Sequence, residues 1–158
     1  MKKYLVLLIL ALLIFGCSGS DISKNNKTFK STIDDPEILK KRATEHFVNG
    51  SIAESKGDFT TAIREFNQAL SYDTSAGIYF ALAKNYLTIN KLVDALKCSK
   101  LSVELDSSEI EYSLLLANIF IEARETDSAA VILEKILVVD SLNVDVYYKL
   151  ARLYENSR

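Results

Sequence analysis

The sequence has few of the residues that tight turns, metal sites and disulfides require. It contains one proline, five glycines, two cysteines and one histidine among 158 residues. Scarce proline and glycine suit helices and argue against a β fold with many tight turns. The sequence also lacks a glycine-rich phosphate loop, a nucleophile elbow and a His/Cys cluster with metal-ligand spacing. We therefore expect no cofactor, no metal and no enzymatic activity.

An excess of charge of one sign is missing as well. The sequence has 19 basic and 21 acidic residues, which give a net charge of −2. Without a basic excess there is no electrostatic footprint for nucleic acid. Apolar residues make up 49% of the chain and charged residues 25%, as in ordinary folded proteins. The length is enough for one domain.

The N-terminal residues form a short apolar segment behind a positive start. Lys2 and Lys3 precede an apolar run from Tyr4 to Phe15, which is shorter than the ~20 residues that a membrane-spanning helix needs. A positive start, a short apolar run and small residues after it are typical of a secretory signal. The residues Ile-Phe-Gly-Cys at 14–17 resemble the lipobox of bacterial lipoproteins.

The lipobox resemblance implies that residues 1–16 are a signal peptide and that Cys17 carries a diacylglycerol thioether. Two acyl chains bury enough methylene groups for stable anchoring. Residues 17–35 are polar without an apolar period, which predicts a flexible tether. Ser18 follows the cysteine, and in such lipoproteins this favours the periplasmic face of the outer membrane. Two alternatives stay open, namely an ordinary signal peptide with an incidental cysteine and an uncleaved anchor.

A period of about 34 residues organises the rest of the chain. Ala62, Ala95 and Ala129 are spaced 33 and 34 residues apart, and so are three aspartates. These aspartates are Asp73, Asp106 and Asp140. A fixed period of this length predicts an array of helical repeats. We expect one helix to begin at Pro36, behind a capping aspartate. We expect further helices at about 60–72, at 92–105 and at 144–156, among others.

The repeated residues resemble the tetratricopeptide repeat. The pattern aromatic, Leu, small, Tyr occurs twice, and the small-aromatic-small pattern of the second helix occurs once. The residues are Tyr79, Leu82, Ala83 and Tyr86, then Tyr147, Leu150, Ala151 and Tyr154, and finally Ala62, Phe66 and Ala69. The resemblance implies an all-α fold, a right-handed α-solenoid of antiparallel helix pairs, over residues 36–158. Its three repeats are 43–75, 76–109 and 110–143, followed by a capping or half repeat at 144–158.

Some positions depart from that pattern. Ser99 and Ser102 replace apolar residues in the second repeat and should weaken its packing. The four repeat tyrosines are expected in the core. The helix at 144–156 has no second helix after it. Tyr148 and Leu153 do not join its polar face, so they are either partner contacts or signs of a longer array.

The resemblance also implies a binding groove on the inner side of each first helix. Its expected residues form an apolar row beside a mixed polar row: Phe47, Phe80, Lys84, Leu87, Leu114, Asn118, Ile121, Tyr148 and Arg152. Such apolar rows mark interaction sites for an extended peptide or a partner helix. The alternative is that these side chains only close gaps between helices. Lys84 and Asn118 match a carboxylate clamp of the family in part, but Phe47 and Phe80 stand where polar residues would help.

These patterns together predict a membrane-anchored, non-enzymatic adaptor or assembly factor of the bacterial cell envelope. Its partners would be another envelope protein or peptide segment and, through the lipid, the membrane. Two alternatives stay open: a self-associating scaffold, hence a homo-oligomer, and an accessory regulator of an envelope enzyme. His46 is interpreted as a structural histidine. Cys98 is interpreted as an inert half-buried thiol, with intermolecular pairing as the alternative.

Overall fold

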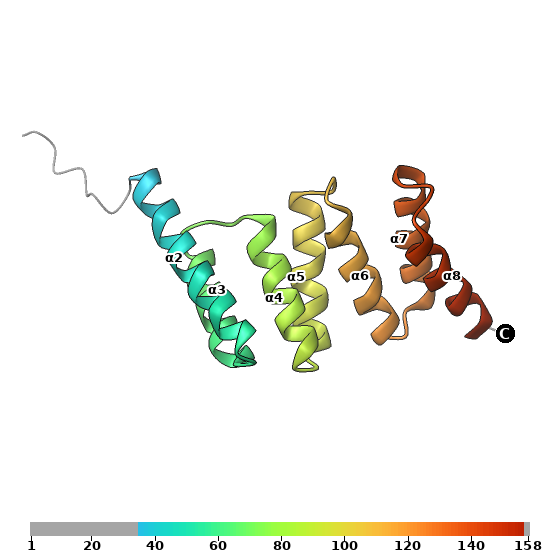
Figure 1. Ribbon diagram of the computed structural model, residues 1–158, viewed down its shortest axis with the longest axis horizontal. Helices are drawn as coiled ribbons and strands as arrows, with labels where there is room; N and C mark the ends of the chain where they lie inside the picture. The colour runs from blue at the N-terminus through green and yellow to red at the C-terminus, as the bar shows by residue number, and fades with distance from the viewer. Residues whose placement is uncertain (1–34, 157–158) are drawn as a thin grey trace, which may run out of the picture. The chain divides into compact units, whose positions relative to one another are not determined.

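The computed structural model describes residues 35–156, which hold seven helices and no strand (Figure 1). The helices are α2 (Pro36–Ser55), α3 (Phe59–Leu70), α4 (Ala76–Thr88), α5 (Leu92–Leu105), α6 (Ile110–Glu122), α7 (Thr126–Val139) and α8 (Val144–Asn156). The expected signal peptide at 1–16, the lipid-bearing Cys17 and the tether up to residue 34 lie outside the described residues. Among the described helices, none is long and apolar enough to cross a membrane.

The helices α2 and α3 begin at capping aspartates, and the sequence predicts the one before α2. Asp35 accepts the backbone N–H of Glu37 at 3.0 Å, and Pro36 opens α2. Asp58 accepts the backbone N–H of Thr61 at 3.0 Å, and this hydrogen bond lowers the pKa of the Asp58 carboxyl. Such caps satisfy amide groups that have no partner within the helix. The predicted start of α2 and the bounds predicted at 92–105 and 144–156 are confirmed.

The turn inside each helix pair is closed in the same way. Gly57, Asn90 and Arg124 occupy the left-handed region, with φ of 77°, 58° and 60°. The N–H of the following residue then donates back to the helix, as from Lys91 to the carbonyl of Tyr86 at 2.8 Å. This is the usual way of ending a helix at a left-handed residue, which glycine and asparagine adopt most easily. The equal turns keep the helix pairs in register.

The core runs through neighbouring helix pairs instead of lying within one of them. Each helix packs against the next along the chain, and α4 also contacts α6. Phe66 of α3 shares a buried cluster with Leu82 of α4, and Leu133 of α7 shares one with Leu150 of α8. The three period-marking alanines, at 62, 95 and 129, are each 0% exposed. Stacking therefore buries the apolar face that a single helix pair leaves exposed.

In each helix pair a small residue on the first helix faces the second helix. At Gly50 an added Cβ would lie 2.7 Å from Cε1 of Phe66. Ala83 and Ala117 occupy the same repeat position and are both 0% exposed. Ser99, which takes the place of Phe66 in the second repeat, is also fully buried, and its hydroxyl has no hydrogen-bond partner within residues 35–156.

The last helix is covered on one side only. Val146, Leu150 and Leu153 of α8 are buried in the cluster shared with α7. Tyr147 and Tyr154 are each 52% exposed, so the expectation that all four repeat tyrosines lie in the core is wrong for these two. The reason is that the described residues place no helix over this side of α8.

We predict that Gly50→Ala lowers the free energy of unfolding by about 1–3 kcal/mol, the usual cost of overpacking a core. The loss should appear although alanine is the better helix former by about 1 kcal/mol, because the added methyl meets the Phe66 ring. Denaturant unfolding followed by circular dichroism measures it. Adding Phe66→Leu should recover part of the loss, and a more stable Gly50→Ala protein would contradict the packing described here.

We predict that Ser99→Ala raises the free energy of unfolding by about 1 kcal/mol, because a buried hydroxyl without a partner costs about 1–3 kcal/mol. Ser102→Ala is the matched control. The Ser102 hydroxyl is equally buried, but it donates to the carbonyl of Ser99 at 2.9 Å, so its removal should not stabilise. Thermal unfolding of both variants measures the two effects. Equal changes in melting temperature for Ser99→Ala and Ser102→Ala would contradict the claim that, of these two hydroxyls, only that of Ser99 lacks a partner among the described residues.

Candidate functional site

The expected groove residues all lie on the first helices of the pairs, α2, α4, α6 and α8. Five of them are half-buried and pack against the core: Phe47, Phe80, Leu87, Leu114 and Ile121. Phe80 also contacts the Tyr112 ring, with centroids 5.0 Å apart, and burial is the main cause that raises the pKa of Tyr112. These side chains thus close gaps between helices while leaving part of their apolar surface open.

The two basic residues of the expected groove differ in their surroundings. The Nζ of Lys84 lies 2.7 Å from Oε1 of Glu54, so its charge is neutralised by the neighbouring helix α2. Arg152 on α8 is exposed and forms no ion pair within the part of the chain that the structure describes. Its guanidinium lies over the Tyr148 ring, 5.9 Å from the centroid. Arg152 is therefore the groove cation available to an incoming anion.

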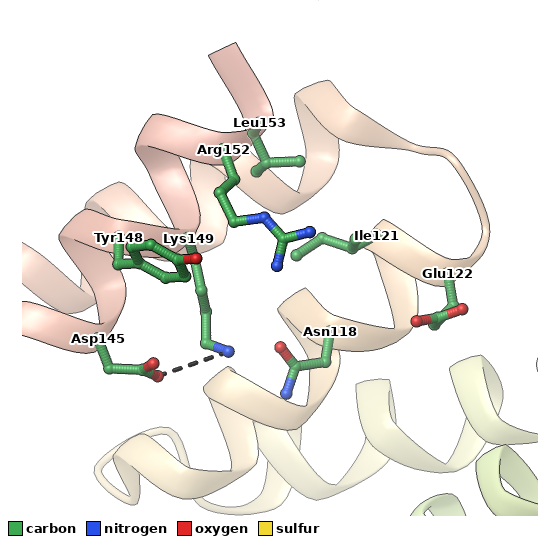
Figure 2. Close-up of a pocket in the computed structure, with 8 residues that line it drawn as sticks. All are labelled: Asn118, Ile121, Glu122, Asp145, Tyr148, Lys149, Arg152 and Leu153. Atoms are coloured by element: carbon green, nitrogen blue, oxygen red, sulfur yellow. Dashed lines mark ion pairs between the residues drawn. The ribbon is translucent and has the colours of Figure 1, made fainter. Parts of the chain in front are cut away.

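A hollow of about 310 Å³ lies between α6 and α8 and collects four of the nine expected residues (Figure 2). These four are Asn118, Ile121, Tyr148 and Arg152. The helices α6 and α8 approach each other less closely than α4 and α6 do, which leaves room for the hollow. Phe47 instead lines a second hollow of about 190 Å³, beside Ser75 and Ile78.

Three further residues that line this hollow were not predicted from the sequence: Glu122, Asp145 and Lys149. Leu153, which the sequence left as a possible partner contact, also lines the hollow but is buried in the core cluster shared with α7. Lys149 and Asp145 are one helical turn apart, and their side chains lie 3.5 Å from each other. This spacing of opposite charges is visible in the sequence. Only the structure shows that this pair borders the hollow, because this depends on how α8 is rotated about its axis relative to α6.

The hollow presents polar groups around an apolar floor. In Figure 2 the Arg152 guanidinium and the Lys149 ammonium point into the space beside the Asn118 amide, and Glu122 lies off to one side. Ile121 supplies apolar surface. Arginine and amide groups bind carboxylate and carbonyl oxygens. The hollow can therefore hold a carboxylate or a polar backbone together with an apolar side chain.

His46 and Cys98, the two residues considered for a chemical role, both lie in surroundings that suit a structural role. His46 Nδ1 lies 2.9 Å from Oε2 of Glu65, and its ring stacks on Tyr72 with centroids 5.8 Å apart. The hydrogen bond with His46 is the main cause that lowers the pKa of the Glu65 carboxyl. Cys98 is half-buried, and burial raises the pKa of its thiol, which disfavours the reactive thiolate.

No protein-family model and no curated protein matches this sequence. Solved structures do. The tetratricopeptide repeat domain of Arabidopsis OM64 has a TM-score of 0.69 at 16% identity, over 74% of this chain and 98% of that one. MamA has a TM-score of 0.69 at 27% identity over 74% of this chain, which spans 64% of the MamA chain.

A third similar structure is the first tetratricopeptide repeat domain of Spaghetti (RPAP3), bound to the HSP90 peptide SRMEEVD. Its TM-score is 0.68 at 16% identity, over 74% of this chain and 96% of that one. With the seven described helices, these likenesses establish the fold class. The described part of the chain is an all-α, right-handed α-solenoid of antiparallel helix pairs of the tetratricopeptide repeat type.

Proposed function

We propose that this chain is a non-enzymatic adaptor that binds a segment of another protein along the inner side of its first helices. The observation that carries the proposal is the hollow between α6 and α8, where Arg152 has no acidic partner among the described residues. The peptide complex of the similar RPAP3 domain supports the same kind of ligand. A repeat array suits this role because stacking produces a long surface from small units.

The chemistry of the hollow indicates which part of a partner it binds. The guanidinium of Arg152 and the amide of Asn118 would receive an acidic side chain or a terminal carboxylate. Ile121 and Tyr148 would contact an apolar side chain next to it. Towards the N-terminal repeats the groove offers the apolar rings of Phe47 and Phe80, and its cation Lys84 is already paired with Glu54. The preferred ligand is thus an extended or helical segment with apolar residues and an acid at one end.

The adaptor would act at the bacterial cell envelope, held by a diacylglycerol thioether on Cys17. The support is the lipobox-like sequence at residues 14–17. Residues 17–35 would serve as a tether between the lipid and the repeats. The partner would then be another envelope protein, met on the periplasmic face of the outer membrane, and the chain would assemble or position that partner instead of modifying it.

The groove is tested by reversing the charge of Arg152. Arg152→Glu should reduce capture of partner proteins by a photocrosslinker at position 121 at least roughly tenfold. A bound partner would bury Arg152 with its acidic group, and a charge pair buried in an interface that loses one member costs about 2–5 kcal/mol. Lys97→Glu is the matched control, since Lys97 is an exposed cation on α5. Mass spectrometry of adducts from intact cells gives the readout. Equal adducts for the wild type and Arg152→Glu would contradict the proposed groove.

The anchor is tested separately at its cysteine. Cys17→Ser should abolish incorporation of labelled fatty acid and release the chain from the membrane fraction, because anchoring needs the acyl chains. Cys98→Ser is the matched control and should keep both the label and the membrane location. Fatty acid label that persists on the Cys17→Ser chain would contradict lipidation at this residue.

A further inference from the structure

One side of α8 is exposed, whereas the same side of the first helix is buried in each complete helix pair. Gly50, Ala83 and Ala117 are buried at the small position of the first helix, whereas Ala151 at the same position is exposed. Tyr154 is 52% exposed, while Phe120 at the same repeat position is 7% exposed. The described residues contain no helix that could cover α8 here, so an aromatic–alanine–aromatic row faces outwards.

The exposed apolar surface extends from α8 onto α7 and the turn between them. Val131, Val138 and Leu142 are 50%, 86% and 85% exposed. At the same repeat positions α5 and its turn carry Lys97, Glu104 and Ser108, and α3 and its turn carry Arg64, Ser71 and Ser75. The earlier repeats are polar where the last one is apolar, so gap-filling common to all repeats does not explain these residues.

Two hydrogen bonds join the α7 and α8 parts of this surface. The Tyr154 hydroxyl donates to Oε1 of Glu134 at 2.9 Å, and the Tyr147 hydroxyl donates to the carbonyl of Ser141 at 3.3 Å. By helical spacing, Glu134 shares its side of α7 with Val131 and Val138. The six apolar residues Val131, Val138, Leu142, Tyr147, Ala151 and Tyr154 therefore form one surface, here named the α7–α8 surface.

The same chain shows what covers the α8 part of this surface, whereas the α7 positions stay exposed in the earlier pairs, as at Lys97 and Arg64. In the three complete pairs the second helix lays a stripe at i, i+4 and i+7 over the small position, and every residue of the stripe is at most 4% exposed. The stripes are Ala62–Phe66–Ala69, Ala95–Ser99–Ser102 and Ala129–Leu133–Ile136. We propose that the α7–α8 surface docks an amphipathic helix of another protein that carries a stripe of this kind. The docked helix covers the α8 row as a second helix covers the first helix of its pair, and it also reaches Val131 and Val138 on α7, positions that no second helix covers in the earlier pairs.

A second copy of the chain does not supply this helix. All three of its own stripes are already buried within their pairs, and its exposed α8 offers the same aromatic–alanine–aromatic row, not the complement. The charges around the α7–α8 surface also favour another protein over a second copy. Among the described residues, helical spacing places three exposed carboxylates at the border of the surface, Asp127, Glu134 and Glu155, against one exposed ammonium, Lys135. A partner helix with basic residues along its edges is favoured.

The docking surface is separate from the proposed groove. Successive residues of a helix are about 100° apart, so Ala151 and Arg152 belong to different sides of α8. The groove hollow is lined by Arg152 and Lys149, neither of which belongs to the α7–α8 surface. One chain can thus hold two partner segments at once, and each site can be disabled alone.

The test uses the full chain in mild detergent and a labelled synthetic peptide with the sequence of residues 58–72, which carries the stripe Ala62–Phe66–Ala69. The control peptide has Phe66→Glu. We expect the chain to bind the first peptide at least about tenfold more tightly than the control, a difference of about 1.4 kcal/mol. Circular dichroism should show the peptide gaining helix on binding, because a free helix of this length is marginal.

Variants of the chain assign the binding to its surface. Ala151→Glu and, independently, Val138→Glu should each weaken peptide binding at least tenfold. Both positions are exposed, so their melting temperatures should match the wild type. Arg152→Glu should leave peptide binding within about twofold while disabling the groove. Failure of the groove experiment therefore leaves this proposal standing.

Two results would overturn the proposal. One is equal binding of the two peptides, or binding that Ala151→Glu and Val138→Glu leave unchanged. The other is a concentration-dependent dimer of the chain in sedimentation that Ala151→Glu abolishes. Such a dimer would give the surface to a second copy instead of a helix from another protein.

Discussion

The close approach of two helices at one small residue per repeat is the contact on which the whole array depends. Gly50, Ala83 and Ala117 let the second helix of each pair come near enough to bury its own stripe. Interiors are packed to crystal-like density, so the size of this residue fixes the distance between the helices. The angle between the two helices of one pair also affects the position of the next pair, because every core cluster contains residues of neighbouring pairs.

The proposed function rests on the surfaces that this stacking leaves open. The inner side of the first helices keeps a partly open apolar row and, between α6 and α8, a hollow in which the Arg152 guanidinium forms no ion pair with a described residue. The last helix keeps the side that a following helix would cover. Both surfaces result from the same rule, since a repeat buries its neighbour's face and leaves its own inner and terminal faces to solvent. An adaptor needs surfaces of this kind and needs no reactive group.

Much of the fold could be predicted from the sequence, because repetition reveals its period. Three alanines at 62, 95 and 129 located the second helices, and the bounds of α5 and α8 followed from the repeat period and the apolar spacing. The resemblance to the tetratricopeptide repeat then supplied the topology. The left-handed residue at each turn is readable at Gly57 and Asn90. It is not readable at Arg124, because arginine has no preference for that region.

The site was harder to predict than the fold, since it depends on distances between helices. Sequence spacing placed Asn118 and Arg152 on the inner side, but only the structure brings them to one hollow with Lys149 and Asp145. It also separates Phe47 from that hollow. The exposure of Tyr147 and Tyr154 could not be inferred from their repeat positions, because those positions are buried only when a further helix follows.

Amide hydrogen exchange of the purified chain tests the central claim most directly, because local stability in a stacked array depends on how many neighbours cover each helix. The account predicts the slowest exchange in α5, which packs between α4 and α6, and markedly faster exchange in α8, which the described residues cover on one side only. Equal protection of α5 and α8 in the chain without a partner would contradict it.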